Sequence, residues 1–104
     1  MIIVIIKYKG KRAREFANEM ISSGLVDKIR NEEGNLRYEY FYPLDNEESV
    51  LLIDSWINQE ALDKHHSLPL MKEIAKLREK HDLHMEVNKY EEIKDNKDDK
   101  YIRK

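Results

Sequence analysis

Two segments of the sequence are apolar on both of their alternating faces, and this pattern limits the folds open to the chain. The first segment is Ile2–Tyr8. The second is Ser49–Trp56, whose two faces hold Val50, Leu52, Asp54 and Trp56, and Leu51, Ile53 and Ser55. A strand with this pattern is buried on both sides, so it belongs in the middle of a sheet. The sequence therefore predicts a sheet with these two segments as its central strands.

Two further segments alternate between apolar and polar residues, as half-buried outer strands do. In the first, one face is a row of large side chains: Leu36, Tyr38, Tyr40 and Tyr42. In the second, Leu83–Tyr90, the apolar face holds Leu83, Met85 and Val87. Both segments are predicted to pair outside the two central strands.

Apolar residues recur with helical spacing in the two segments that connect the strands. The first stripe is Ala13, Phe16, Ala17, Met20 and Ile21, and further turns are predicted at Leu25–Ile29. In the second connection, Asn58 is predicted to cap a helix whose inward stripe is Ala61, Leu62 and His65. Pro69 is expected to interrupt this helix, which then continues to about Lys80 with the spaced residues Met71, Ile74, Ala75 and Arg78.

The resulting order is β-α-β-β-α-β, the ferredoxin-like α+β arrangement with an antiparallel four-stranded sheet. Residues 1–93 are predicted to form this domain, and residues 94–104 a charged tail that is mobile or bound to a partner. Two helices cover only one face of such a sheet, and an uncovered apolar face is unusual for a monomer. We therefore expect a homodimer in which two sheets cover each other; a monomer with a partly apolar exposed sheet is the alternative.

The composition excludes several functional classes. Nineteen Lys and Arg against 21 Asp and Glu leave a net charge of −2, without the basic excess of a nucleic-acid-binding protein. The longest apolar run, Met1–Ile6, is far shorter than the roughly 20 residues of a membrane helix and lacks a signal-peptide cleavage site. Because the chain has no cysteine, disulfides and cysteine-based sites are excluded, and we expect a cytoplasmic protein. No phosphate-binding loop or dinucleotide motif predicts a nucleotide or flavin cofactor.

His65 is the strongest candidate for chemistry among the four histidines. It shares the inward stripe of its helix, and a neutral imidazole suits proton abstraction near pH 7. The alternative is a core histidine bonded to a backbone carbonyl. Its neighbour His66 is expected to lean towards Asp63 and solvent. His81 and His84 are expected to be ordinary exposed or half-buried histidines, and the spacing of the four predicts no metal site.

Three further residues are candidates for the same site. Asp54 lies on an otherwise apolar strand face, where a carboxylate is costly unless it is paired or solvated. It is therefore expected to orient a histidine or to mark the wet end of the strand. Trp56, the only tryptophan, and Tyr38 are either packing residues or the wall of a pocket for a planar ligand.

Five short motifs, taken in order, resemble those of the antibiotic biosynthesis monooxygenase family, which includes quinol monooxygenases. They are Lys9–Lys11, Glu15–Phe16, Glu33–Tyr38, Asp54–Trp56 and Glu60–His65, within a resemblance that covers about residues 2–92. The resemblance implies a dimeric α+β barrel with a pocket between the sheet and the helices of each subunit. It also implies oxidation of electron-rich aromatics by molecular oxygen without metal or flavin, although other relatives degrade haem or isomerise small phosphorylated sugars.

The sequence departs from the family pattern at several positions. Leu70 stands where many members have a second histidine, and Leu52 stands where some anthrone-oxidising members have an asparagine. The haem-degrading members have an asparagine in the first strand, which is absent here, and a tryptophan in place of His65. These departures disfavour haem degradation and leave the substrate open.

The residues and the resemblance together predict a monooxygenase without a cofactor that oxidises a small quinol or phenol with molecular oxygen. His65 is expected to be the general base and Asp54 to orient it, while Trp56, Tyr38 and Leu52 contact the aromatic substrate. An isomerase of a small carbonyl compound and a non-catalytic binder of haem or another small molecule are the alternatives.

Overall fold

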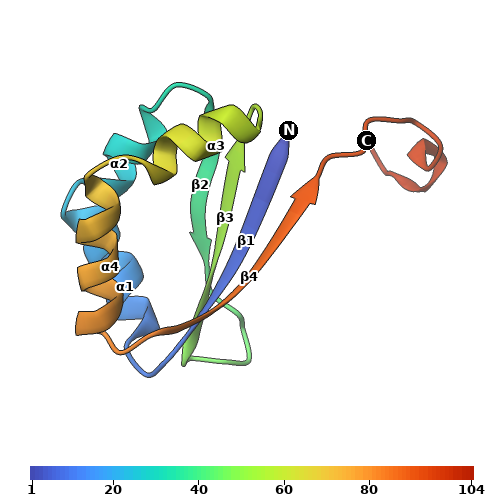
Figure 1. Cartoon of the computed structure of the whole chain (residues 1–104). Helices are drawn as coiled ribbons and strands as arrows, with labels where there is room; N and C mark the ends of the chain where they lie inside the picture. The colour runs from blue at the N-terminus through green and yellow to red at the C-terminus, as the bar shows by residue number, and fades with distance from the viewer.

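One antiparallel sheet, with strands in the order β2-β3-β1-β4, forms the centre of the computed structural model, which describes residues 1–104 (Figure 1). The strands are β1 (Ile2–Lys9), β2 (Asn35–Phe41), β3 (Ser49–Trp56) and β4 (His84–Glu91). β1 and β3 occupy the two central positions, as their apolar faces predict. The ferredoxin-like β-α-β-β-α-β fold predicted from the sequence is therefore confirmed.

The helices all lie on one face of the sheet and leave the other face open (Figure 1). They are α1 (Ala13–Ser22), α2 (Leu25–Arg30), α3 (Gln59–His66) and α4 (Leu70–Lys80). The side chain of Asn58 accepts a hydrogen bond from the Ala61 N–H, which fixes the start of α3 as predicted. Pro69 separates α3 from α4. None of these helices has both the length and the apolar character needed to cross a membrane.

The hydrophobic core lies between the helices and the covered face of the sheet. From α1 it receives most of the predicted stripe: Ala13, Phe16, Ala17 and Met20. The prediction is wrong for Ile21, which is exposed because α1 ends at the next residue and the chain turns away from the sheet. It is also wrong for Ala75, which lies on the outer side of α4, whereas Ile74 is buried.

A β-bulge in β2 changes which side chains of this strand face the core. The pairing of β2 with β3 shifts between Asn35 and Arg37, so the strict alternation of faces is lost there. As a result Leu36 is 54% exposed and borders a shallow hollow on the open face with Ile3 and Ile5. The predicted row is therefore wrong at Leu36, while Tyr38 is buried as its place in the row requires.

His81 does not have the exposure that its position suggests. Its side chain is only 3% exposed, and its Nε2 lies 2.8 Å from Oε1 of Glu19 on α1. The ring also packs edge-on against Phe16, with 6.2 Å between ring centroids. The expectation of an exposed or half-buried His81 is wrong because its partner is 62 residues away in the chain. His84 is exposed, as expected.

The chain continues beyond β4 and runs away from the sheet (Figure 1). A single turn of 3₁₀ helix forms at Asp99–Tyr101, and every residue from 92 to 104 is exposed. The apolar side chains of this tail, Ile93, Tyr101 and Ile102, are exposed with the rest. The charged tail therefore lies beside the fold and adds nothing to its core.

Candidate active site

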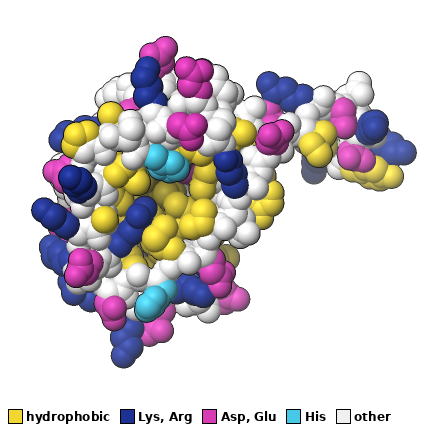
Figure 2. All heavy atoms as spheres, viewed as in Figure 1, with side chains coloured by type: hydrophobic (Ala, Val, Ile, Leu, Met, Phe, Trp, Pro, Cys, Tyr) yellow, Lys and Arg dark blue, Asp and Glu magenta, His cyan; other side chains and the backbone are white.

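A cavity of about 270 Å³ lies between the covered face of the sheet and the helices α3 and α4. Figure 2 shows this side of the molecule as a hollow of hydrophobic side chains, with a histidine at its edge and a basic side chain reaching across. The apolar lining consists of Val4, Ile6, Leu52, Leu62, Met71, Ile74, Met85 and Val87. The polar lining consists of Tyr38, Asp54, Gln59, His65, His66, Arg78 and Lys89. An apolar space with a few polar groups is typical of a site for a small ligand.

His65 is placed at this cavity by the inward stripe of α3, and its side chain is only 3% exposed. Its Nδ1 lies 2.9 Å and 3.0 Å from the two carboxylate oxygens of Glu32, which follows α2. Since a carboxylate only accepts hydrogen bonds, the proton of the neutral ring is held on Nδ1. The other nitrogen, Nε2, makes no hydrogen bond within the chain and is left with a free lone pair. This arrangement allows His65 to accept a proton from a ligand in the cavity.

The indole of Trp56 packs against the imidazole of His65 and does not line the cavity. The indole is fully buried, and its ring lies 4.7 Å from the imidazole of His65 at an interplanar angle of 31°. The sequence leaves Trp56 either in the wall of the pocket or as a packing residue; in the structure the indole packs on His65 and is not among the side chains that line the cavity. The reason is that α3 passes over the end of β3, so the two rings stack. Tyr38 and Leu52, also expected at the pocket, both line it.

Asp54 lines the cavity from the sheet but does not orient His65. Its side chain is 4% exposed, and its Oδ1 has no hydrogen-bond partner. Burial raises the pKa of Asp54 to about 7; the Trp56 indole opposes this rise, and the negative charge of Glu32 adds to it by a smaller amount. The carboxylate that binds His65 is that of Glu32, 33 residues earlier in the chain. Glu32 carries no periodic or motif signal in the sequence, because the contact exists only in the folded chain.

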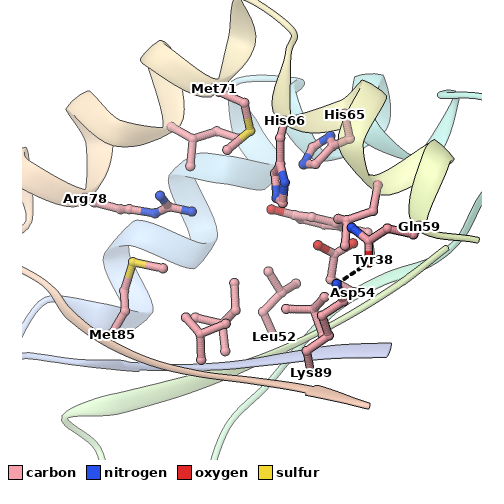
Figure 3. A pocket seen from close by; sticks show the side chains of 15 residues that line it. Tyr38, Leu52, Asp54, Gln59, His65, His66, Met71, Arg78, Met85 and Lys89 are labelled. Carbon is pink, nitrogen blue, oxygen red and sulfur yellow. Dashed lines mark hydrogen bonds between the residues drawn. The ribbon is translucent and has the colours of Figure 1, made fainter. Parts of the chain in front are cut away.

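Arg78 brings a positive charge to the cavity from α4 (Figure 3). Its Nη2 donates a hydrogen bond to the hydroxyl of Tyr8 at 3.1 Å, whereas its Nε is buried and has no partner. Its position on the inner stripe of an amphipathic helix is the one signal in the sequence that marks Arg78, and that signal alone predicts no function for it. Its guanidinium is suited to stabilising a negative charge that develops on a bound ligand.

His66 also faces the cavity, beside His65 (Figure 3). The two imidazole centroids are 5.6 Å apart, and burial together with the neighbouring His65 lowers the pKa of His66. His66 is exposed, as expected from its lean towards Asp63 and solvent, and it also lines the mouth of the cavity. At the same mouth, Lys89 of β4 donates a hydrogen bond to the side-chain oxygen of Gln59 on α3.

The sequence profile of the antibiotic biosynthesis monooxygenase family matches residues 1–77. The chain belongs to this family. A curated relative from Bacillus subtilis (strain 168), named "Putative monooxygenase YcnE", is 32% identical over 60 residues, which are 58% of this chain and 61% of the relative. The match therefore spans less than two thirds of that relative's length.

Solved structures of the same fold superimpose on most of this chain. SnoaB of Streptomyces nogalater, described as a cofactor-independent oxygenase, has a TM-score of 0.76 at 12% identity, with 90% of this chain and 94% of SnoaB covered. A conserved protein of Methanosarcina mazei Go1 has a TM-score of 0.70 at 26% identity, with coverages of 86% and 91%. In this family member no group of three or more acidic, histidine or cysteine side chains is arranged to hold a metal ion.

Proposed function

We propose that this protein is a cofactor-independent monooxygenase that oxidises a small quinol or related phenol with molecular oxygen. The observation that carries the proposal is the pairing of His65 with Glu32, which leaves Nε2 free at an apolar cavity. A base in this position removes the proton of a bound hydroxyl group. The phenolate that results is a far better electron donor to oxygen than the neutral phenol. Membership of the family supports the same reaction class.

The proposed reaction converts a hydroquinone and O₂ into a hydroxyquinone and water. One oxygen atom forms a new bond to a ring carbon, and the other leaves as water. Four electrons pass from the ring to oxygen, and the hydrogens of the two hydroxyls and of the oxidised carbon end in the water and the new hydroxyl. His65 takes the first hydroxyl proton at Nε2, and Glu32 stabilises the imidazolium that forms.

The remaining lining fits the intermediates of this reaction. Arg78 places a guanidinium beside the space in which the phenolate forms, and a positive charge is most effective in a cavity that excludes water. The apolar side chains of β1, β3 and α4 provide that exclusion. Burial raises the pKa of Tyr38, so its hydroxyl stays protonated near neutral pH and is able to donate a hydrogen bond to the ligand.

We also propose that the protein is a homodimer formed through the open face of the sheet. That face exposes a hollow bordered by Met1, Ile3, Ile5, Leu36 and Ile53, which no helix covers. A second copy of the same face is the simplest cover for such a surface. Analytical ultracentrifugation at micromolar concentration should give twice the chain mass of 12.5 kDa. A single species of monomer mass would contradict the proposal.

Oxygen consumption by chelator-treated protein tests the reaction. A panel of hydroquinones and anthrones should give uptake with at least one substrate, and ¹⁸O₂ should place one labelled oxygen in the product. His65→Ala should abolish most of this uptake, whereas His81→Ala, which removes a histidine far from the cavity, serves as the control. Uptake that depends on an added metal, or no uptake with any member of the panel, would contradict the proposed function.

A further inference from the structure

The carboxyl group of Asp54 lies in the core, where the Trp56 indole is the one neighbouring group that favours its charged form, and no hydrogen bond reaches its Oδ1. The residue lies on β3, on the face that it shares with the buried side chains of Val50, Leu52 and Trp56. Its neighbours across the sheet are Val4 on β1 and Tyr38 on β2. A buried carboxyl oxygen without a hydrogen bond destabilises a fold, and an apolar side chain would pack better at this site. The packing of the core therefore gives no reason for an aspartate here.

The cavity gives such a reason, because Asp54 is one of its lining residues. Figure 3 shows the carboxyl rising from β3 beneath the histidines of α3, with Arg78 of α4 to one side. His65 and Asp54 therefore approach the same space from opposite layers, the helices and the sheet. Around Asp54 the floor of the cavity is apolar, with Val4 and Leu52 on either side. For a ligand with one hydroxyl at His65, Asp54 is the carboxyl group that a second hydroxyl meets on the sheet side of the cavity.

We propose that Asp54 binds a second hydroxyl of the aromatic substrate, so that this protein selects rings with two hydroxyl groups over rings with one. The inference rests on the proposed function, in which His65 takes the proton of the first hydroxyl. The cavity, at about 270 Å³, lies at the small end of the range for ligand sites and suits a ring system of one or two rings. The carboxylate of Asp54, which lines the cavity, accepts the hydrogen bond of the second hydroxyl.

Binding without oxygen separates this selection from catalysis. Trp56, the only tryptophan, stacks on His65, so its fluorescence is a built-in readout of ligand binding in the cavity. The probes are hydroquinone and 4-methoxyphenol, which have similar shapes but two hydroxyls and one. Titrations at pH 8 are preferable, because the pKa of Asp54 is raised to about 7 and its carboxyl is then ionised and only accepts hydrogen bonds.

The wild-type protein should bind hydroquinone about tenfold more tightly than 4-methoxyphenol, as expected for a hydrogen bond to a buried charged group. In Asp54→Leu this preference should disappear through weaker binding of hydroquinone, while 4-methoxyphenol binds within about twofold of its wild-type affinity. Asp27→Leu, which removes an exposed carboxylate on α2, is the control and should keep the full preference. If Asp54→Leu does not fold, the isosteric Asp54→Asn carries the test and should reduce the preference at least about threefold.

Two results would overturn the inference. A wild-type protein that binds and oxidises both probes equally keeps the proposed function but has no selection by Asp54. A preference that survives in the Asp54 variants shows that this carboxyl binds only solvent or serves the fold. Failure of the proposed function itself has a different signature, because then neither probe quenches Trp56 and no member of the quinol panel consumes oxygen.

Discussion

The protein contains two buried histidines that each contact a glutamate, and they differ in what the other side of the imidazole meets. His65 and His81 are each 3% exposed, and their contacts to Glu32 and Glu19 are 2.9 Å and 2.8 Å long. His65 uses Nδ1 for this contact and leaves Nε2 at the cavity. His81 uses Nε2, and its Nδ1 is buried without a partner.

The surroundings of the two glutamates differ in the same way. Glu32 has only His65 as a side-chain partner, whereas Glu19 also accepts hydrogen bonds from Lys80 at 3.0 Å and 3.1 Å. Glu19 thus joins α1 to the end of α4 through two basic residues. A buried histidine that contacts a glutamate is therefore a candidate base only where its second nitrogen reaches a ligand site. The other pair is a contact between two helices.

The largest expected effect comes from removing the two histidines in turn. His65→Ala should lower quinol turnover about a hundredfold or more, because a positioned base contributes at least that much to the rate. The residual rate should rise as the pH approaches the pKa of the substrate, which then ionises without help. Oxygen uptake at equal concentrations of folded protein measures both effects. His81→Ala should lower the melting temperature but leave turnover within about twofold, and a similar loss of turnover in the two variants would break the comparison.

Replacing the two glutamates should also give different turnover in the two variants, but the difference should be smaller than for the histidines. Glu32→Gln should reduce kcat about ten- to hundredfold, because the amide removes the charge that stabilises the imidazolium and no longer fixes its tautomer. Anaerobic binding of hydroquinone, followed by Trp56 fluorescence, should change little. Glu19→Gln is the matched variant and should keep the wild-type kcat. Unchanged kcat in Glu32→Gln would leave the Glu32 contact as packing alone.

Asp54 differs from both glutamates, because it is buried and binds neither histidine. Its pKa is raised from 3.8 to about 7 in the folded protein, so the folded state holds its proton more tightly than the unfolded state. Wild-type stability should therefore fall as the pH rises between these two values, by on the order of a few kcal/mol. The side chain of Asp54→Asn does not titrate. The free energy of unfolding of this variant, relative to that of the wild type, should therefore increase from pH 4 to pH 8 in denaturant unfolding. A constant difference would show that the carboxyl is not desolvated.

The smallest expected effect concerns Glu19 at low pH. Hydrogen bonds from His81 and Lys80 hold the pKa of Glu19 below its usual 4.5. The stability that this contributes is present above 4.5 and is lost as the pH falls through the lower folded value. Glu19→Gln should remove this part of the acid sensitivity of the melting temperature. Because the group is well solvated, high salt should shrink the difference, and a difference that persists in high salt would contradict this reading.

Much of the scaffold follows from local patterns in the sequence. Apolar residues on both faces of β1 and β3 predicted the central positions of these strands, and Asn58 predicted the start of α3. The same stripe of α3 predicted that His65 faces inward, which it does. These features depend on residues a few positions apart, whose periodicity directly records which face of an element is buried.

The remainder of the candidate site depends on contacts between distant parts of the chain. The bulge at Leu36 changes which side chains of β2 face the helices, and no turn residue or periodicity in the sequence predicts it. Trp56 packs against His65 because of the way in which α3 crosses β3. His66 and Arg78 reach the cavity because of the angles at which α3 and α4 pack on the sheet. A helical stripe shows which side is inward but not what that side meets.

Local patterns in the sequence are sufficient to predict the order of the elements, the central pair of strands and the inward direction of His65. Local spacing is sufficient for these because burial repeats with the period of the strand or helix. Two features of the site follow from the folded chain alone: Glu32 rather than Asp54 binds His65, and Asp54 lines the cavity with its Oδ1 unpaired. The physical reason is that both outcomes depend on atoms from separate elements meeting within hydrogen-bond distance, which the packing of the helices on the sheet alone sets.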